Sequence, residues 1–219
     1  MLWLCLYSVT NYLNTYKMKN LFKFISIFIL FNSIFTSLSA EESFIPKPPS
    51  LNATNYILID SVSGRVLAEN GSDEMIEPAS ITKVMTCFVA ADQIAKGFVS
   101  LEDEVLISEN CWRKGGSKMF IREGTRVLFS DLMKGMVIQS GNDASCAIAE
   151  HVAISEEGFV ELMQMYVKEL GMENTQFKNV SGLPDPEHYS SARDLALLTK
   201  NLIDRFPDHY GLYKEKYFT

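Results

Sequence analysis

Residues 78–97 read Pro-Ala-Ser-Ile-Thr-Lys-Val-Met-Thr-Cys-Phe-Val-Ala-Ala-Asp-Gln-Ile-Ala-Lys-Gly and predict an amphipathic helix. The apolar side chains recur every three or four residues, as on one face of a helix, at Ile81, Val84, Met85, Phe88, Ala91 and Ile94. Gly97 follows as a stop signal. The helix start carries Ser80 and Lys83, and no other serine in the chain has a lysine three residues later.

The segments around this helix predict a few short strands and several further helices. Tyr56–Asp60 and Arg65–Glu69 are β-rich runs separated by Ser-Val-Ser-Gly, which predicts an antiparallel hairpin. Residues 104–128 indicate short strands and turns, and residues 174–190 indicate a loop. Further helices are expected from a Ser130-Asp131 cap to Gln139, from the break at 140–142 to about Val152, and from Ser155 to Leu170 before Gly171. A final helix is expected from Ser191 to Arg205, ended before Pro207. Few strands and clustered helices predict an α+β fold.

Composition and charge exclude several classes of function. The chain has 219 residues, of which 47% are hydrophobic and 21% charged, as in a globular protein. The first 40 residues hold three lysines and no acidic residue, so the remainder has 17 basic and 27 acidic side chains. Such an acidic body predicts no nucleic-acid binding. The three histidines are far apart and neither H-E-x-x-H nor C-x-x-C occurs, so we expect no metal site and no cofactor.

The N-terminus has the pattern of a secretory signal peptide. An almost continuous apolar run, Leu21–Phe31, follows basic residues and precedes the small-residue stretch Thr36–Ala40. Met18 is a candidate for the true initiator, and cleavage is expected between Ser39 and Glu41. An uncleaved membrane anchor is the alternative, although about 20 apolar residues are needed for a span. The predicted division is a signal peptide at 1–40, a polar Pro-rich leader at 41–54 and one domain at 55–219.

Export and cleavage would determine which cysteines the mature chain retains. Cys5 lies upstream of the cleavage point, which leaves Cys87, Cys111 and Cys146 in the mature chain. Three cysteines permit at most one disulfide. Because Cys87 and Cys146 sit in apolar helical patterns, where free cysteine acts as a small hydrophobe, we expect no structural disulfide and no catalytic cysteine.

Ser80 and Lys83 have the residue types of a nucleophile and its base. At the start of a helix, positions i and i+3 share a face. A lysine there can take the serine proton if burial or a nearby cation lowers its pKa, and the helix N-terminus favours developing negative charge. The alternative is a serine N-cap followed by a solvated lysine. No G-x-S-x-G and no phosphate-binding glycine motif occurs elsewhere.

Ser140-Gly141-Asn142 forms a second candidate group, at a break between two predicted helices. A hydroxyl and a carboxamide two residues apart on a tight turn can face one cleft. Ser140 could pass a proton to a leaving amine, and Asn142 could bind a substrate amide as donor and acceptor. A helix cap with a flexible glycine is the alternative reading.

Together these segments resemble a known enzyme family. Pro78–Thr86 and Gln139–Ala144 resemble the first two signature motifs of serine-type D-alanyl-D-alanine carboxypeptidases of the peptidase S11 family, the low-molecular-mass penicillin-binding proteins, which are relatives of serine β-lactamases. Trp112–Phe120 resembles the family's intervening segment, and Ser181–Asp185 and His188–Ala196 resemble its downstream block. Gly141, where class A β-lactamases have Asp, favours a carboxypeptidase.

The resemblance implies a fold and a mechanism. It implies a partial β-lactamase/transpeptidase-like fold, with an antiparallel sheet packed against a helical cluster. Ser80 would attack the bond between two terminal D-alanines of a peptidoglycan stem peptide, with Lys83 as general base, Ser140 in the proton relay and Asn142 holding the substrate amide. β-Lactams would acylate the same serine. No cofactor is implied, the expected location is the periplasm or cell envelope, and association with the inner membrane is left open.

One departure from the family concerns its third motif. No Lys-Thr-Gly or Lys-Ser-Gly occurs in the 219 residues, so the strand that carries this motif is expected to be missing and the domain C-terminally truncated. In the family this motif binds the substrate carboxylate and completes the oxyanion hole, where one donor is worth about 10²–10³ in rate. The family assignment therefore leaves the activity of this chain open. The alternatives are a non-catalytic cell-wall binding fragment and a β-lactamase-like hydrolase.

Overall fold

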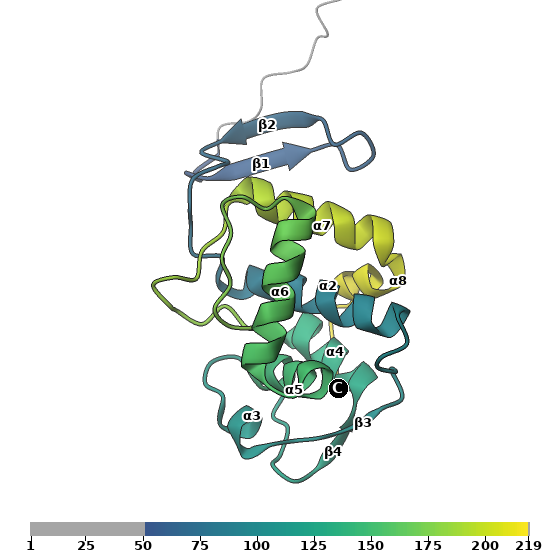
Figure 1. The fold of residues 1–219 in the computed structure, drawn as a ribbon. Coiled ribbons are helices and arrows are strands. Elements are labelled where there is room, and N and C mark those ends of the chain that lie inside the picture. Colours follow the sequence, from purple (N-terminus) through teal and green to yellow (C-terminus); the bar gives the residue numbers. More distant parts are fainter. Residues whose placement is uncertain (1–50, 219) are drawn as a thin grey trace, which may run out of the picture. The chain divides into compact units, whose positions relative to one another are not determined.

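The computed structural model describes residues 51–218 as a mixture of helices and short strands (Figure 1). The expected signal peptide and residues 41–50 of the expected leader lie outside the described residues. The elements in chain order are β1 (Tyr56–Ile59), β2 (Val66–Asn70), the 3-10 turn η1 (Ala79–Ile81), α2 (Thr82–Ala95), β3 (Glu104–Leu106), α3 (Glu109–Arg113), β4 (Arg126–Leu128), α4 (Phe129–Gln139), α5 (Asn142–Ala153), α6 (Glu156–Leu170), α7 (Ala192–Arg205), α8 (Pro207–Tyr210) and η2 (Gly211–Lys214). This content confirms the α+β prediction.

The strands form two separate antiparallel pairs. β1 and β2 make the predicted hairpin, with Tyr56 opposite Asn70, and β3 pairs with β4. The hairpin turn is stabilised by Asp60, whose carboxylate accepts the Ser63 N–H at 2.7 Å. The hairpin lies along α7 (Figure 1). Arg193, at the start of α7, pairs with Glu69 and Asp73 at the far end of the hairpin.

The helices enclose the hydrophobic core around α2. α2 packs against α4, α5, α6 and α7, and its buried face includes Met85 and Phe88. Phe129, Phe159 and Leu198 are fully buried partners from the surrounding helices. Full burial of a side chain of this size contributes about 1.5–3 kcal/mol, so this cluster holds the start of α2 in place. Within residues 51–218 no helix is both long and apolar enough to cross a membrane.

The local start and stop signals are confirmed for two of the predicted helices. Ser155 caps α6 by accepting the Gly158 N–H at 3.0 Å, and Gly171 ends the helix in the left-handed region. Ser191 caps α7 by accepting the Asp194 N–H at 3.2 Å. These caps could be predicted because their donors lie within three residues of the serine.

Three sequence-based details were wrong. α4 begins at Phe129 without a Ser130-Asp131 cap, because the Phe129 and Ser130 N–H groups donate to the carbonyls of Asp103 and Leu101 instead. The short helix α3 interrupts the segment predicted as strands and turns. The chain also continues after Arg205 as α8, because Pro207 at the first helical position starts a new helix.

The expectation of no structural disulfide is also wrong. Cys111 of α3 and Cys146 of α5 form a disulfide, with their Cα atoms 5.2 Å apart. The two helices pack against each other, so both cysteines are fully buried and face one another. Among residues 51–218, Cys87 remains as a free buried thiol. The apolar surroundings of Cys146 were predicted, but they did not reveal a partner 35 residues away.

Candidate active site

Lys83 is buried at the first turn of α2. Only 4% of the residue is exposed, and its Nζ donates to the Ser181 carbonyl at 2.7 Å. Burial disfavours the ammonium form and lowers the pKa of Lys83 to about 8. The amine is therefore neutral in an appreciable fraction of molecules near neutral pH, as a general base requires.

Ser80 lies in the 3-10 turn η1 that leads directly into α2. Lys83 follows three residues later in α2, and in a helix residues at i and i+3 share a face. Ser80 is exposed, whereas Lys83 is buried. Ala79, immediately before the serine, has φ 45°, an uncommon conformation for a residue with a Cβ. Backbone strain of this kind is concentrated at functional sites.

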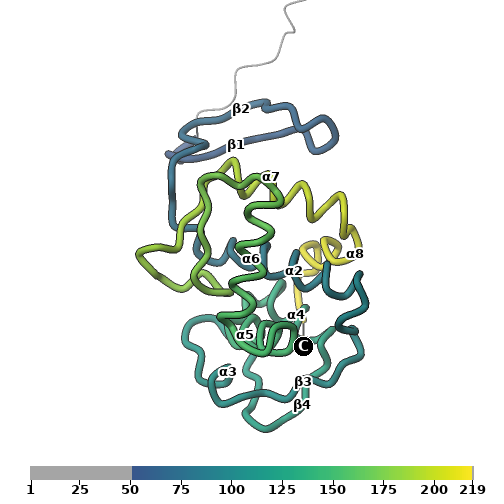
Figure 2. Tube along the Cα trace, in the orientation of Figure 1, coloured from purple at the N-terminus to yellow at the C-terminus, as the bar shows by residue number. Residues whose placement is uncertain are grey.

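The loop at 174–190 holds the start of α2 through buried hydrogen bonds. Besides the Lys83–Ser181 bond, Thr86 donates to the Val180 carbonyl at 2.7 Å. Thr82 Oγ1 and His188 Nε2 lie 2.8 Å apart. Figure 2 shows this segment passing beside the start of α2. The loop therefore positions three residues of the first helical turns.

Gly182 allows the same loop to contact the backbone just before Ser80. A Cβ added at Gly182 would lie 1.8 Å from the Ala79 carbonyl oxygen. The residue also has φ 83°, which glycine adopts at no steric cost. Only glycine fits here, so the loop can lie against the peptide that carries the candidate nucleophile.

Ser140 occupies the break between α4 and α5. It is the C-cap of α4 and has a left-handed conformation, with φ 57°. Its Oγ is buried, and no hydrogen-bond partner for it exists within residues 51–218. Because a buried hydroxyl without a partner costs free energy, this atom is suited to a ligand or a transient proton.

Asn142 is the first residue of α5 and is held on two sides. Its backbone N–H donates to the Ser117 carbonyl and its Nδ2 donates to the Gly115 carbonyl, both at 2.7 Å. Gly116 lies between these acceptors, and a Cβ there would approach Asn142 Nδ2 to 2.6 Å. In the described chain the Gly115 bond is the carboxamide's only hydrogen bond. Its oxygen and its second N–H therefore remain available to a ligand.

The two candidate groups are brought together through the loop at 174–190. Gly182 contacts Ala79 beside Ser80, and its neighbour Leu183 lies within 3.9 Å of the position of a Gly116 Cβ. Gly116 in turn contacts Asn142. α2 also packs against both α4 and α5. Ser80, Lys83, Ser140 and Asn142 therefore belong to one region of the molecule.

Sequence reasoning missed the residues that support this region. The Asp143 carboxylate is fully buried and accepts the backbone N–H groups of Met119, Phe120 and Ile121 at 2.9–3.3 Å. His188 was noted only as part of the family resemblance. An acidic residue directly after Asn142, followed by the mostly small and apolar run Ala144–Ala149, was the available signal for Asp143.

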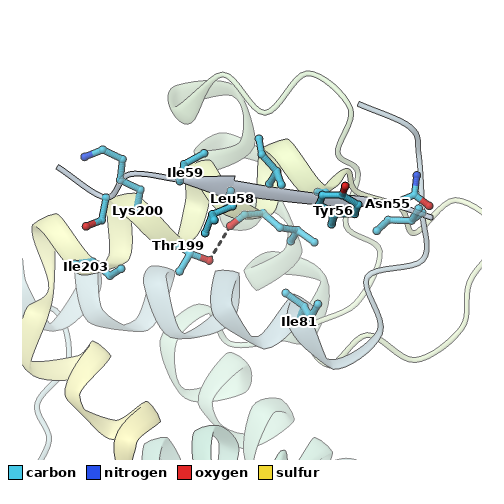
Figure 3. A pocket seen from close by; sticks show the side chains of 14 residues that line it. Asn55, Tyr56, Leu58, Ile59, Ile81, Thr199, Lys200 and Ile203 are labelled. Atoms are coloured by element: carbon cyan, nitrogen blue, oxygen red, sulfur yellow. Dashed lines mark hydrogen bonds between the residues drawn. The ribbon is translucent and has the colours of Figure 1, made fainter. Parts of the chain in front are cut away.

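Two other features do not belong to the candidate site. Cys111, Cys146 and Glu150 form the one group within residues 51–218 with spacing suited to a metal, but both sulfurs are engaged in the disulfide. An apolar groove of about 490 Å³ lies between β1 and α7. Figure 3 shows Leu58 and Ile203 on its walls, together with the Thr199 hydroxyl, which donates to the Leu195 carbonyl. Lys200 also lines the groove, and its Nζ pairs with the Asp204 carboxylate at 2.5 Å.

Comparison with known proteins decides the family. Residues 42–219 match the profile of peptidase S11, described as D-alanyl-D-alanine carboxypeptidase. The chain belongs to the peptidase S11 family. D-alanyl-D-alanine carboxypeptidase DacC of Escherichia coli strain K12 is 44% identical over 190 residues, covering 84% of this chain and 47% of the relative. DacA of Haemophilus influenzae is 40% identical over 200 residues, covering 90% and 50%.

Solved structures of penicillin binding proteins share the fold. Penicillin binding protein 5 from Haemophilus influenzae matches with a TM-score of 0.78 and 40% identity, over 80% of this chain and 52% of that one. Penicillin binding protein 6B from Escherichia coli matches with a TM-score of 0.77 and 37% identity, over 81% and 58%. These neighbours confirm the predicted transpeptidase-like fold. This S11 chain spans about half the length of the curated relatives that it matches.

Proposed function

We propose that the protein is a serine-type D-alanyl-D-alanine carboxypeptidase, which removes the terminal D-alanine from peptidoglycan stem pentapeptides. The observation that carries the proposal is the buried Lys83, with a pKa of about 8, one turn from Ser80. Membership of the S11 family supports the same activity. A lysine that is partly neutral beside an exposed serine is the pairing that nucleophilic attack needs.

The reaction proceeds through an acyl-enzyme in two steps. Ser80 Oγ bonds to the carbonyl carbon between the two D-alanines while its proton passes to Lys83 Nζ. The C–N bond then breaks, and the departing D-alanine amine takes a proton relayed through Lys83 and Ser140. Water next attacks the Ser80 ester, which returns the serine hydroxyl and releases the shortened peptide as a carboxylate.

Ser140 and Asn142 serve proton transfer and substrate binding. The lack of a partner for Ser140 Oγ supports a relay role, since the atom has free donor and acceptor capacity. The free oxygen and N–H of the Asn142 carboxamide can bind the substrate's peptide amide as acceptor and donor. The Gly115 carbonyl fixes the orientation of that carboxamide.

The proposed site of action is the periplasm or cell envelope, where the enzyme trims the cell wall and thereby influences cell shape. The lysine-flanked apolar run at 21–31 supports export, and contact with the inner membrane during it. The Cys111–Cys146 disulfide supports the same location, because disulfides persist in oxidising compartments. β-Lactams are the proposed covalent inhibitors.

Labelling with a fluorescent penicillin tests the nucleophile. The full chain should acquire a covalent label, and Ser80→Ala should abolish it. Ser130→Ala removes a hydroxyl near the start of α4, outside the candidate site, and should leave the label intact. A label that survives Ser80→Ala would remove Ser80 from the mechanism.

Two further measurements separate the alternatives. Release of D-alanine from a pentapeptide identifies a carboxypeptidase, whereas rapid turnover of the penicillin identifies a β-lactamase-like hydrolase. Binding to peptidoglycan with neither a covalent adduct nor released D-alanine would identify a non-catalytic cell-wall binding protein.

A further inference from the structure

Two cross-links join the same pair of segments one helical turn apart. The disulfide connects Cys111 of α3 to Cys146 of α5. Four residues after Cys111, the Gly115 carbonyl accepts the Nδ2 proton of Asn142, which lies four residues before Cys146. Residues i and i+4 share a face of a helix, so the sulfur and the carboxamide lie on the same side of α5. The disulfide therefore lies one turn of α5 away from the hydrogen bond that orients Asn142.

The segment that follows α3 and contains Gly115 has little to hold its shape by itself. Residues 114–118, which we call the strap, read Lys-Gly-Gly-Ser-Lys, and Gly116 has φ 80°. Two consecutive glycines give the backbone more conformational freedom than other residues would. The strap nevertheless supplies both carbonyls that bind Asn142, from Gly115 and Ser117. Its geometry must therefore be fixed at its ends.

Both ends of the strap are attached to α5. Beyond its C-terminal end, Met119, Phe120 and Ile121 donate their N–H groups to the Asp143 carboxylate. Beyond its N-terminal end, the disulfide attaches α3 to the second turn of the same helix. Lys114 adds an ion pair with Glu156 of α6. The disulfide is the one covalent attachment among these.

We infer that the Cys111–Cys146 disulfide is a positioning device for Asn142. It fixes the N-terminal end of the strap so that the Gly115 carbonyl holds one carboxamide proton and leaves the oxygen and the other proton for substrate. The cysteines touch no substrate, so they are positioning residues. The effect of the disulfide on the reaction rate rests on the proposed function, whereas its effect on the positions of Asn142 and the strap does not.

Hydrogen–deuterium exchange tests the structural consequence without any activity. The full chain is compared with Cys111→Ala/Cys146→Ala, and with Cys87→Ala as the matched control that removes a buried thiol but leaves the disulfide. The double variant should exchange the Asn142 amide and the strap amides several-fold faster, while α7 stays protected. Unchanged protection of Asn142 in the double variant would overturn the inference. Reduction of the unmodified chain with dithiothreitol, with thiols counted by mass, gives the same comparison should the double variant fail to fold.

Penicillin acylation tests the catalytic consequence. Displacement of a positioning group by about 1 Å costs up to about 10²-fold in rate, so the acylation rate constant of the double variant should fall between about 10- and 100-fold. Dithiothreitol should lower the rate for the unmodified chain and for Cys87→Ala alike. A purely stabilising disulfide would leave the rate per folded molecule unchanged, which contradicts the inference. Absence of any labelling in the unmodified chain refutes the proposed function, while the exchange result still decides whether the disulfide positions Asn142.

Discussion

Two lysines at opposite ends of α2 show how surroundings decide whether a lysine can act as a base. Lys83 is buried with no carboxylate among its hydrogen-bond partners in residues 51–218, and burial lowers its pKa to about 8. Lys96, just past the other end of the helix, is exposed and pairs with Asp92 at 2.6 Å, and this carboxylate raises the pKa of Lys96. The same residue type is therefore poised for proton transfer at one end and permanently charged at the other.

The first prediction concerns the pH dependence of acylation. With a pKa of about 8, about one Lys83 in ten is neutral at pH 7. The acylation rate should therefore rise with pH through an apparent pKa of about 8 and then level off. Stopped-flow acylation by a fluorescent penicillin between pH 6 and 9.5 measures this. Lys83→Arg should be inactive and Lys96→Met should keep the profile, whereas a rate independent of pH over this range would count against Lys83 as the base.

The second prediction concerns Gly182. Gly182→Ala places a methyl group against the Ala79 carbonyl and adds left-handed strain. Gly97→Ala adds a similar strain at φ 74°, but no heavy atom lies within 4 Å of its Cβ. Strain alone costs roughly 1–2 kcal/mol, so Gly97→Ala should lose about that much unfolding free energy and Gly182→Ala clearly more. Urea unfolding measures both losses, and equal losses would show that the contact with Ala79 is unimportant.

At the scale of elements, the sequence predicted those helices and strands whose formation depends on residues close together in the chain. The hairpin at 56–70 and helices α2, α6 and α7 follow from periodicity and from caps within three residues. The disulfide could not be predicted, because α3 has only five residues and its packing on α5 depends on the tertiary fold. The α4 cap was mistaken for the same reason, since its backbone acceptors come from the loop before β3.

The candidate site likewise has features that could be predicted from local sequence and features that could not. The spacing of Ser80 and Lys83 could be read directly, because three residues make one turn. That Lys83 is buried against Ser181, 98 residues away, could not be read from any local pattern. The support given to the strap by Asp143 was equally hidden, since its partners lie 22–24 residues earlier in an irregular segment.

The third prediction concerns the first turn of α5. Asp143→Asn replaces one acceptor oxygen with an NH₂ group that faces backbone donors. Loss of hydrogen bonds to a buried charged group costs about 1.5–3 kcal/mol, so the free energy of unfolding should fall by about that amount. Asp131→Asn is the control, because Asp131 also lies in a helix first turn but makes only a half-exposed pair with Lys134 at 3.3 Å. Its loss should stay below about 1 kcal/mol. Chemical denaturation compares them, and similar losses would contradict the anchoring role.

At the scale of the whole molecule, the candidate site depends on contacts between distant parts of the chain. Three hydrogen bonds join the first turns of α2 to the loop at 174–190, across 94 to 106 residues. Each involves a buried group, so loss of the loop would leave several polar atoms without partners. The geometry around Ser80 and the stability of the fold are therefore coupled through this loop.

The last prediction concerns His188, whose imidazole takes part in one of the hydrogen bonds between this loop and α2. Its Nδ1 accepts the Lys178 N–H at 3.0 Å, so the neutral ring carries its proton on Nε2 and donates to Thr82. Burial lowers the pKa of His188 below the ordinary value of 6.5. Between the two pKa values the unfolded chain binds more protons than the folded one, so stability is retained above about pH 6.5 and is lost as the pH falls below it.

Urea unfolding at pH 7 and pH 5 should therefore show a fall in unfolding free energy, and this fall should be smaller in His188→Gln, which cannot titrate. Burial also lowers the pKa of His209. The variant His209→Gln therefore measures how much His209 contributes to the fall in unfolding free energy between pH 7 and pH 5. If His188→Gln loses as much stability between the two pH values as the unmodified chain, His188 is not the group whose protonation loosens the loop. If the fall is reduced, penicillin acylation should decline over the same pH interval more steeply in the unmodified chain than in His188→Gln, because protonation of the ring breaks the bond from Lys178 and releases the residues that hold Lys83.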